Sequence, residues 1–306
     1  MFIGVKASFI VISLLFLISC GTKVKSNQEK DNGKQDLLSE LPLPVVPENL
    51  DSAEIAGYLL NHFWDGLDFT DTVKTYNRDF MEQNFANFAH LLIVANDSTA
   101  RREGVKTLMK KAEADPEAYI LLSEIAYHYL YDPNSPMLHE DSFIPFMEIF
   151  KDSELIDEAE RERNRFLLEG ALKNRKGMKA ADFPYLTREG KTTSLYKTPV
   201  RGSLLVVFYD PDCDNCKEII EGMSTNPNLS EMIAQGEITL LAIYSGENKE
   251  LWDKTAPSLP GEWIVGYNSG TIEDNDDYLF RASPTIYLLD ENKTVIVKDF
   301  SAARLQ

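Results

Sequence analysis

The sequence predicts a two-domain protein of α + α/β class, with an all-helical domain over 48–175 and an α/β sandwich over 176–306. In the first region, apolar residues recur at the three- and four-residue spacing of helices. In the second, short apolar runs suited to buried strands alternate with helical stretches. A length of 306 residues with 43% hydrophobic residues suits two domains with real cores and excludes wholesale disorder.

The charge balance argues against several classes of function. The chain has 31 Lys and Arg against 49 Asp and Glu, a formal net charge of −18. This disfavours binding to nucleic acid, which needs clustered cations, and electrostatic docking on anionic lipid. The helical region alone holds 13 basic and 25 acidic residues. Three cysteines are too few for a disulfide-stapled scaffold, and the four histidines form no dense cluster with them, so zinc fingers are excluded.

Residues 1–20 have the features of an export signal. Lys6 precedes a nearly unbroken apolar run over 7–18, which is short of the roughly 20 residues of a transmembrane helix but suits a signal-peptide core. The end of the segment, Leu17-Ile18-Ser19-Cys20, resembles the lipobox of bacterial lipoproteins. That resemblance implies cleavage before Cys20, lipidation of its thiol, and a cell-envelope lipoprotein facing the periplasm from the outer or the inner membrane. An ordinary signal peptide with an incidental cysteine is the alternative.

Residues 21–47 predict a flexible tether between this anchor and the first domain. They are polar, rich in Lys, Asn, Gln and Ser, and end in Leu41-Pro42-Leu43-Pro44-Val45-Val46-Pro47. Prolines at that density block both helix and sheet, so the tether is expected to stiffen into extended structure.

Capping residues and prolines divide the helical region into elements. Asp51 or Ser52 can cap a first helix, Asp97-Ser98 a later one, and Asp115-Pro116 opens another. Prolines at 133 and 136 interrupt the helical pattern. Helices are therefore expected at about 52–64, 79–95, 98–114, 116–131, 139–150 and 157–174.

The second region shows the order strand, helix, strand, helix, hairpin. Short edge strands are expected at 181–186 and 193–196, and buried strands at 204–209 and 239–244. Helices are expected at 216–223 and 250–256. Two further strands, at 286–289 and 295–298, flank a turn-rich loop and predict a hairpin.

The motif that carries chemistry is Tyr209-Asp210-Pro211-Asp212-Cys213-Asp214-Asn215-Cys216, between a buried strand and a helix. With Cys20 lipidated, Cys213 and Cys216 are the two remaining cysteines. A C-x-x-C in this position is typical of a thioredoxin-like redox motif. Unpaired N–H groups and the dipole at a helix N-terminus stabilise a thiolate on Cys213, which attacks a substrate disulfide. Cys216 is close enough to resolve the mixed disulfide.

Residues 176–306 resemble the thioredoxin-like superfamily. The second landmark is Ser283-Pro284-Thr285 before a strand, where that superfamily has a cis-proline beside its cysteines. The long stretch between the landmarks, with Trp252 and Trp263, suits the TlpA/ResA-like branch. The whole chain resembles Bacteroidetes lipoproteins with an N-terminal helical domain of unknown function and a C-terminal thioredoxin-like domain. Phe208-Tyr209-Asp210-Pro211 and Arg281-Ala282-Ser283-Pro284-Thr285 carry that resemblance.

The resemblance implies a membrane-anchored thiol–disulfide oxidoreductase with Cys213 as nucleophile and Cys216 as resolving thiol. Pro284 would shape a substrate groove, Ser283 would offer backbone groups to an extended peptide, and Tyr209 and Pro211 would flank the site. No metal and no organic cofactor is needed. The expected partners are protein thiols and disulfides, an upstream electron donor, and the membrane through the anchor at Cys20. The oligomeric state is left open.

Three departures from the thioredoxin pattern affect the expected chemistry. Asp212 replaces the tryptophan before the first cysteine, and Val207 replaces a buried acid of the preceding strand. The carboxylates of Asp210, Asp212 and Asp214 should raise the pKa of Cys213, which predicts a reducing or weakly poised couple. The short C-terminus, 301–306, leaves one face of the sheet poorly covered, and the helical domain is a candidate to cover it.

Other interpretations of the C-x-x-C remain open. It could be a structural disulfide or half of a zinc site, although the four histidines all lie in the helical region. A peroxiredoxin is disfavoured, because Asp210 and Val206 stand where that family needs a hydroxyl and a proline. The rival function is a non-catalytic binding or assembly lipoprotein, in which the helical domain carries the function and the C-x-x-C is structural or regulatory.

Overall fold

The computed structural model describes residues 40–299. The predicted signal peptide, Cys20, most of the predicted tether, and residues 300–306 lie outside the described residues. None of the helices in residues 40–299 has the combination of length and apolar character that a membrane-spanning helix needs.

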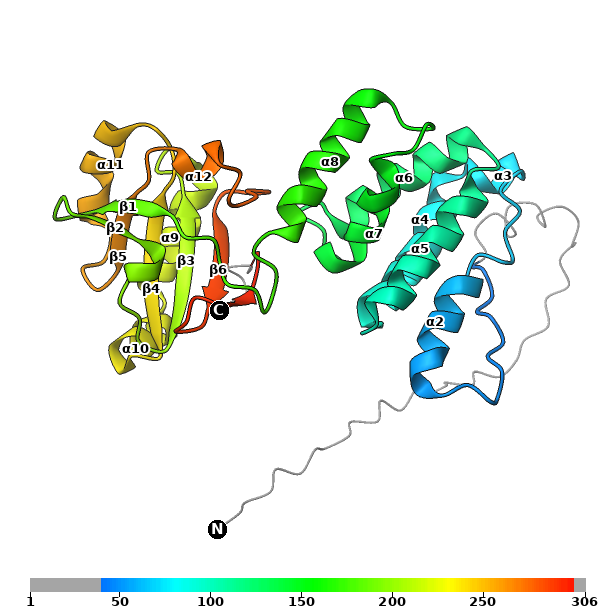
Figure 1. The fold of residues 1–306 in the computed structure, drawn as a ribbon, viewed down its shortest axis with the longest axis horizontal. Helices are drawn as coiled ribbons and strands as arrows, with labels where there is room; N and C mark the ends of the chain where they lie inside the picture. Colours follow the sequence, from blue (N-terminus) through cyan, green and yellow to red (C-terminus); the bar gives the residue numbers. More distant parts are fainter. Residues whose placement is uncertain (1–39, 300–306) are drawn as a thin grey trace, which may run out of the picture. The chain divides into compact units, whose positions relative to one another are not determined.

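Residues 52–172 fold into helices, which confirms the predicted class of this region (Figure 1). Aspartate side chains cap three of the expected helices: Asp97, Asp115 and Asp157 each accept a backbone N–H of the first turn. Asn77 does the same for a fourth. The helices are α2 (Ser52–His62), α3 (Thr72–Thr75), α4 (Arg78–Val94), α5 (Ser98–Ala112), α6 (Pro116–Leu130), α7 (Glu140–Phe150) and α8 (Glu158–Leu172).

The helices enclose a core rich in aromatic side chains. Phe85 of α4 contacts Phe88, Tyr129 and Phe146, which joins α4 to α6 and α7. Burial of such rings supplies much of the stabilisation of a helical array. The single turn α3 was not predicted, because four residues are too few to show a helical period.

The second region contains a seven-stranded mixed sheet in the order β2-β1-β5-β4-β3-β6-β7. Strands β3, β4 and β5 are parallel, and β6 runs antiparallel to β3. The strands are β1 (Pro184–Thr187), β2 (Thr192–Ser194), β3 (Ser203–Tyr209), β4 (Ile238–Tyr244), β5 (Ile264–Tyr267), β6 (Thr285–Leu289) and β7 (Val295–Val297). The helices are α9 (Asp214–Thr225), α10 (Pro227–Gln235), α11 (Lys249–Thr255) and α12 (Thr271–Asp274).

Both faces of the central strand β3 are buried. Leu205, Val207 and Tyr209 face the side covered by α9, α10 and α11. Leu204, Val206 and Phe208 face the other side, where the cluster contains Phe183, Leu195, Ile272 and Tyr278. The face expected to be poorly covered is thus packed by segments of the same region, so the helical region need not cover it.

Three elements were missing from the expected order: α10, β5 and the four-residue helix α12. Strand β5 has only four residues, so its apolar run is too short to identify, although Pro260-Gly261 just before it is a turn signal. Helix α10 begins at Asn226-Pro227, where the Asn226 side chain accepts from the N–H groups of Asn228 and Leu229. An asparagine cap followed by proline is a helix start signal, but it was not used to predict α10.

Candidate active site

Cys213 lies at the N-cap of α9, directly after the loop that follows β3. Its backbone is extended there, and its Sγ accepts the N–H of Cys216 at 3.4 Å. The residue is half-buried, so its sulfur can be reached from solvent. The buried strand β3 therefore leads to a thiol at the start of a twelve-residue helix.

Cys216 lies one turn further along α9 and is fully buried. Its Sγ lies 3.0 Å from the Oγ of Ser283 and accepts the N–H of Asp210 at 3.5 Å. Burial raises the pKa of the Cys216 thiol to about 11. Both thiols are free. The pair is thus asymmetric, with one accessible sulfur and one buried sulfur that keeps its proton at neutral pH.

The pKa of Cys213 is lowered from the usual range of a thiol, chiefly because the N–H of Cys216 donates to its sulfur. The prediction that neighbouring aspartates raise this pKa was wrong. Asp214 is 97% exposed and pairs with Lys217 at 3.0 Å, so water and an ammonium group screen its charge. Asp210 directs one carboxylate oxygen to the N–H of Asp212. Amide donors at the helix start outweigh exposed carboxylates.

The loop before β6 lies opposite the two thiols. The Ser283–Pro284 peptide bond is cis, as the resemblance implied. The carbonyl oxygen of Ser283 lies 3.9 Å from the Sγ of Cys213 and accepts the side-chain amide of Asn215 at 2.7 Å. Ser283 is exposed and Pro284 half-buried, so the structure brings both together with Cys213 and Cys216.

Tyr209 and Pro211 were expected to flank the site. Tyr209 lines a cavity of about 260 Å³ together with Ala282 and Ser283, next to the loop before β6. Tyr209 and Pro211 are both buried, and they line a cavity of about 320 Å³ against α9 and the segment after α11. The Tyr209 hydroxyl is buried without a hydrogen-bond partner in the described residues, and burial raises its pKa.

Sequence reasoning missed two polar contacts at the site. The Asn215 amide holds the Ser283 carbonyl, and the Ser283 hydroxyl contacts the Cys216 sulfur. Both residues stood inside the quoted motifs, but only the fold shows that the motifs face each other. Among residues 40–299, no group of three or more His, Cys, Asp and Glu side chains could hold a metal ion.

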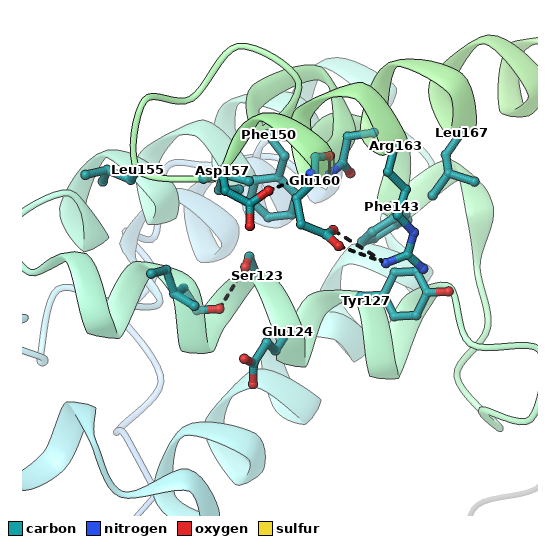
Figure 2. A pocket seen from close by; sticks show the side chains of 13 residues that line it. Ser123, Glu124, Tyr127, Phe143, Phe150, Leu155, Asp157, Glu160, Arg163 and Leu167 are labelled. Atoms are coloured by element: carbon teal, nitrogen blue, oxygen red, sulfur yellow. Dashed lines mark hydrogen bonds and ion pairs between the residues drawn. The ribbon is translucent and has the colours of Figure 1, made fainter.

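A second cavity, of about 530 Å³, lies in the helical region (Figure 2). Arg163 lies over the ring of Tyr127, 4.5 Å from its centroid, and pairs with Glu160 at 3.4 Å. Glu124 pairs with Arg78, and Asp157 caps α8. Because its charges are paired and no thiol lines it, this cavity offers no comparable chemistry.

Two kinds of comparison found similar proteins. The model of the family described as "Domain of unknown function (DUF5106)" matches residues 19–174. A thioredoxin-like protein from Bacteroides caccae, known from a crystal structure, is 32% identical, covering 87% of this chain and 96% of its own, with a TM-score of 0.76. That similarity includes both the helical and the thioredoxin-like region, and it confirms the expected fold class.

Two further solved structures overlap only part of the chain. A conserved protein of unknown function from Bacteroides fragilis is 42% identical, covering 43% of this chain and 96% of its own, with a TM-score of 0.41. The thioredoxin domain of a thiol-disulfide oxidoreductase from Bacteroides vulgatus is 18% identical, covering 41% and 89%, with a TM-score of 0.36. No curated protein matches the chain.

Proposed function

The chain belongs to the DUF5106 family and is a thioredoxin-like protein, and on that premise we propose that it is a thiol–disulfide oxidoreductase anchored in the cell envelope. The observation that carries the proposal is the asymmetry of the two thiols. Cys213 is accessible with a lowered pKa, whereas Cys216 is buried behind it with a raised pKa. A reactive first thiol and a protected second thiol are what disulfide exchange requires.

The exchange proceeds in two steps. The Cys213 thiolate attacks a disulfide of a substrate protein; a bond forms between Cys213 and one substrate sulfur, and the other substrate sulfur leaves as a thiolate and takes up a proton. The Cys216 thiol then loses its proton and attacks the Cys213 sulfur. This second step releases the reduced substrate and leaves a Cys213–Cys216 disulfide, so two electrons pass from this protein to the substrate.

The loop opposite the thiols supports both steps. An extended substrate segment would pair with the backbone of Ser283, as in the thioredoxin-like superfamily. The Ser283 hydroxyl, 3.0 Å from the Cys216 sulfur, can stabilise the thiolate that forms before the second attack. A dithiol protein of the envelope would return the two electrons afterwards. No metal or organic cofactor enters this scheme.

Reduction of insulin in the presence of dithiothreitol tests the proposal. The wild-type protein should accelerate insulin precipitation, and Cys213→Ser should abolish the acceleration. Equal rates for the two proteins would instead support the rival function, an assembly or binding lipoprotein in which the thiol pair is not catalytic.

The membrane anchor is a separate part of the proposal. Residues 17–20 resemble a lipobox, so the Cys20 thiol would carry the lipid and hold the protein at the envelope membrane. Labelling of cells with a radioactive fatty acid should mark the wild-type protein and leave Cys20→Ala unlabelled. Labelling of both proteins, or of neither, would contradict the anchor without touching the redox chemistry.

A further inference from the structure

A cavity of about 210 Å³ lies beside residues 281–284, the loop before β6, which is called the redox loop below. One wall comes from the thioredoxin-like region, with Asn215 and Ile219 on α9 and Pro284 in the loop before β6. The other wall comes from the segment between α6 and α7, including Pro133 and Leu138. The helical region thus forms one wall of a cavity beside the redox loop.

Buried charges fix the redox loop to the helical region. Arg281, two residues before Ser283, has a side chain only 6% exposed, and it pairs with Glu140 at the start of α7 at 3.2 Å. Lys298, 8% exposed, pairs with the same carboxylate at 3.0 Å. The Arg281 guanidinium also pairs with Asp299 and lies 4.8 Å from the ring centroid of Tyr131. Buried pairs of this kind tolerate little displacement of their partners.

Further contacts join the end of α8 to the same part of the thioredoxin-like region. Leu279 packs in the hydrophobic core of the helical region, and Gly170 leaves room for it. The Asn174 amide donates to the carbonyl of Asp277 at 2.7 Å. Lys298 donates to the carbonyl of Lys173 at 3.2 Å, near the C-terminal end of α8. Several independent contacts therefore fix the position of Leu138, in the segment between α6 and α7, relative to the redox loop.

We propose that this cavity is a substrate subsite, in which the helical domain holds an apolar side chain of an extended polypeptide next to its disulfide. Pro133, Leu138, Ile219 and Pro284 supply the apolar part of a mixed lining. Asn134, Asn215 and Thr285 supply polar groups, and Arg281 and Asp299 pair with each other. A volume of 210 Å³ accommodates one aliphatic or aromatic side chain and excludes a folded domain. The subsite is continuous with Asn215 and the Ser283 carbonyl, where the backbone of the substrate is expected. The inference rests on the proposed function and gives the helical domain a role in it.

Filling the cavity tests the inference. Leu138→Trp should obstruct the subsite, whereas a small aromatic disulfide such as Ellman's reagent needs no polypeptide subsite. Second-order rate constants are measured for the prereduced protein with insulin and with Ellman's reagent. The ratio of the insulin to the Ellman's rate constant should fall at least fivefold in Leu138→Trp. Val94→Trp, at an exposed end of α4, is the matched control and should keep the wild-type ratio.

A second variant keeps the inference testable if Leu138→Trp does not fold. Leu138→Ala enlarges the subsite, so it should favour disulfide peptides with a tryptophan beside the cysteine over those with an alanine, relative to wild type. An unchanged ratio in Leu138→Trp together with unchanged peptide preference in Leu138→Ala would overturn the subsite. Should wild type react no faster than Cys213→Ser with either disulfide, the proposed function itself fails, which is a distinguishable result.

Discussion

One helix turn separates the two thiols of the C-x-x-C motif and gives them different surroundings. Cys213 receives an N–H donor and solvent access, whereas Cys216 receives burial. The spacing of the cysteines and the proline at 284 could be predicted from the sequence, because both are local motifs. The direction of the Cys213 pKa shift could not, because it depends on where exposed aspartates point and on Lys217 neutralising Asp214.

Alkylation against pH tests this account of Cys213. Iodoacetamide reacts with the thiolate, so a lowered pKa moves the rise in rate to lower pH. In Cys216→Ser, which retains the backbone N–H at position 216, the rate should reach half its maximum below the pH of about 8.5 expected for a free cysteine. In Cys213→Ser the remaining thiol should react only above about pH 10, since burial raises the pKa of Cys216 to about 11. A midpoint for Cys213 at or above 8.5 would refute the amide-donor explanation.

Asn215 is predicted to compete with the substrate. Its amide occupies the Ser283 carbonyl at 2.7 Å, which an incoming peptide N–H would need. Replacing Asn215 with Ala should therefore raise the rate constant with insulin about fivefold, the equivalent of roughly 1 kcal/mol for one hydrogen bond. The rate constant with Ellman's reagent should stay within twofold. A slower reaction with insulin would mean that Asn215 orders the loop rather than blocks it.

At the scale of elements, most long helices and long buried strands were predicted and the four-residue elements were not, while the capped helix α10 was missed. Helices α5, α6 and α8 begin after the aspartates that cap them. Strand β3 has seven residues, six of them buried, whereas β5 and α12 have only four residues each. A four-residue element spans about one helical turn or two strand repeats, so its periodicity is indistinguishable from chance.

The N-cap of α6 provides a stability test at this scale. Asp115 accepts the N–H of Ala118 at 3.0 Å and also the hydroxyl of Tyr76. Asp115→Ala should lower the free energy of unfolding by about 1–2 kcal/mol, measured by urea denaturation. Asp253→Ala, which removes an exposed ion pair with Lys249 inside α11, is the control and should cost less than about 0.5 kcal/mol. Equal losses in the two variants would show that Asp115 does not act as a cap.

At the scale of the whole described chain, the helical and thioredoxin-like regions are joined by contacts distant in sequence. Glu140, Arg281 and Lys298 form one buried charge network, and Leu279 enters the core of the helical region. The two regions could be told apart from the sequence, because their apolar periodicities differ. Their junction could not be predicted, since nothing local marks which charged residues of an acidic chain become buried.

Breaking the network should be costly. Glu140→Gln leaves the charges of Arg281 and Lys298 without their shared carboxylate, so the free energy of unfolding should fall by about 3–5 kcal/mol. Glu148→Gln is the matched control, because the side chains of its pair with Arg102 are 31% and 48% exposed, and it should cost under about 1 kcal/mol. Thermal or urea unfolding of both variants measures the difference. A loss for Glu140→Gln as small as that of the control would show that the junction does not depend on these charges.

Trapping of the mixed disulfide tests the exchange chemistry most directly. In Cys216→Ser the second step is blocked, so the first step should accumulate a covalent adduct when the reduced protein meets insulin. We predict that mass spectrometry finds an insulin chain joined to Cys213 and that dithiothreitol releases it. If no adduct forms while Ellman's reagent still modifies Cys213, the thiol is reactive but does not exchange with protein disulfides, which would contradict the account.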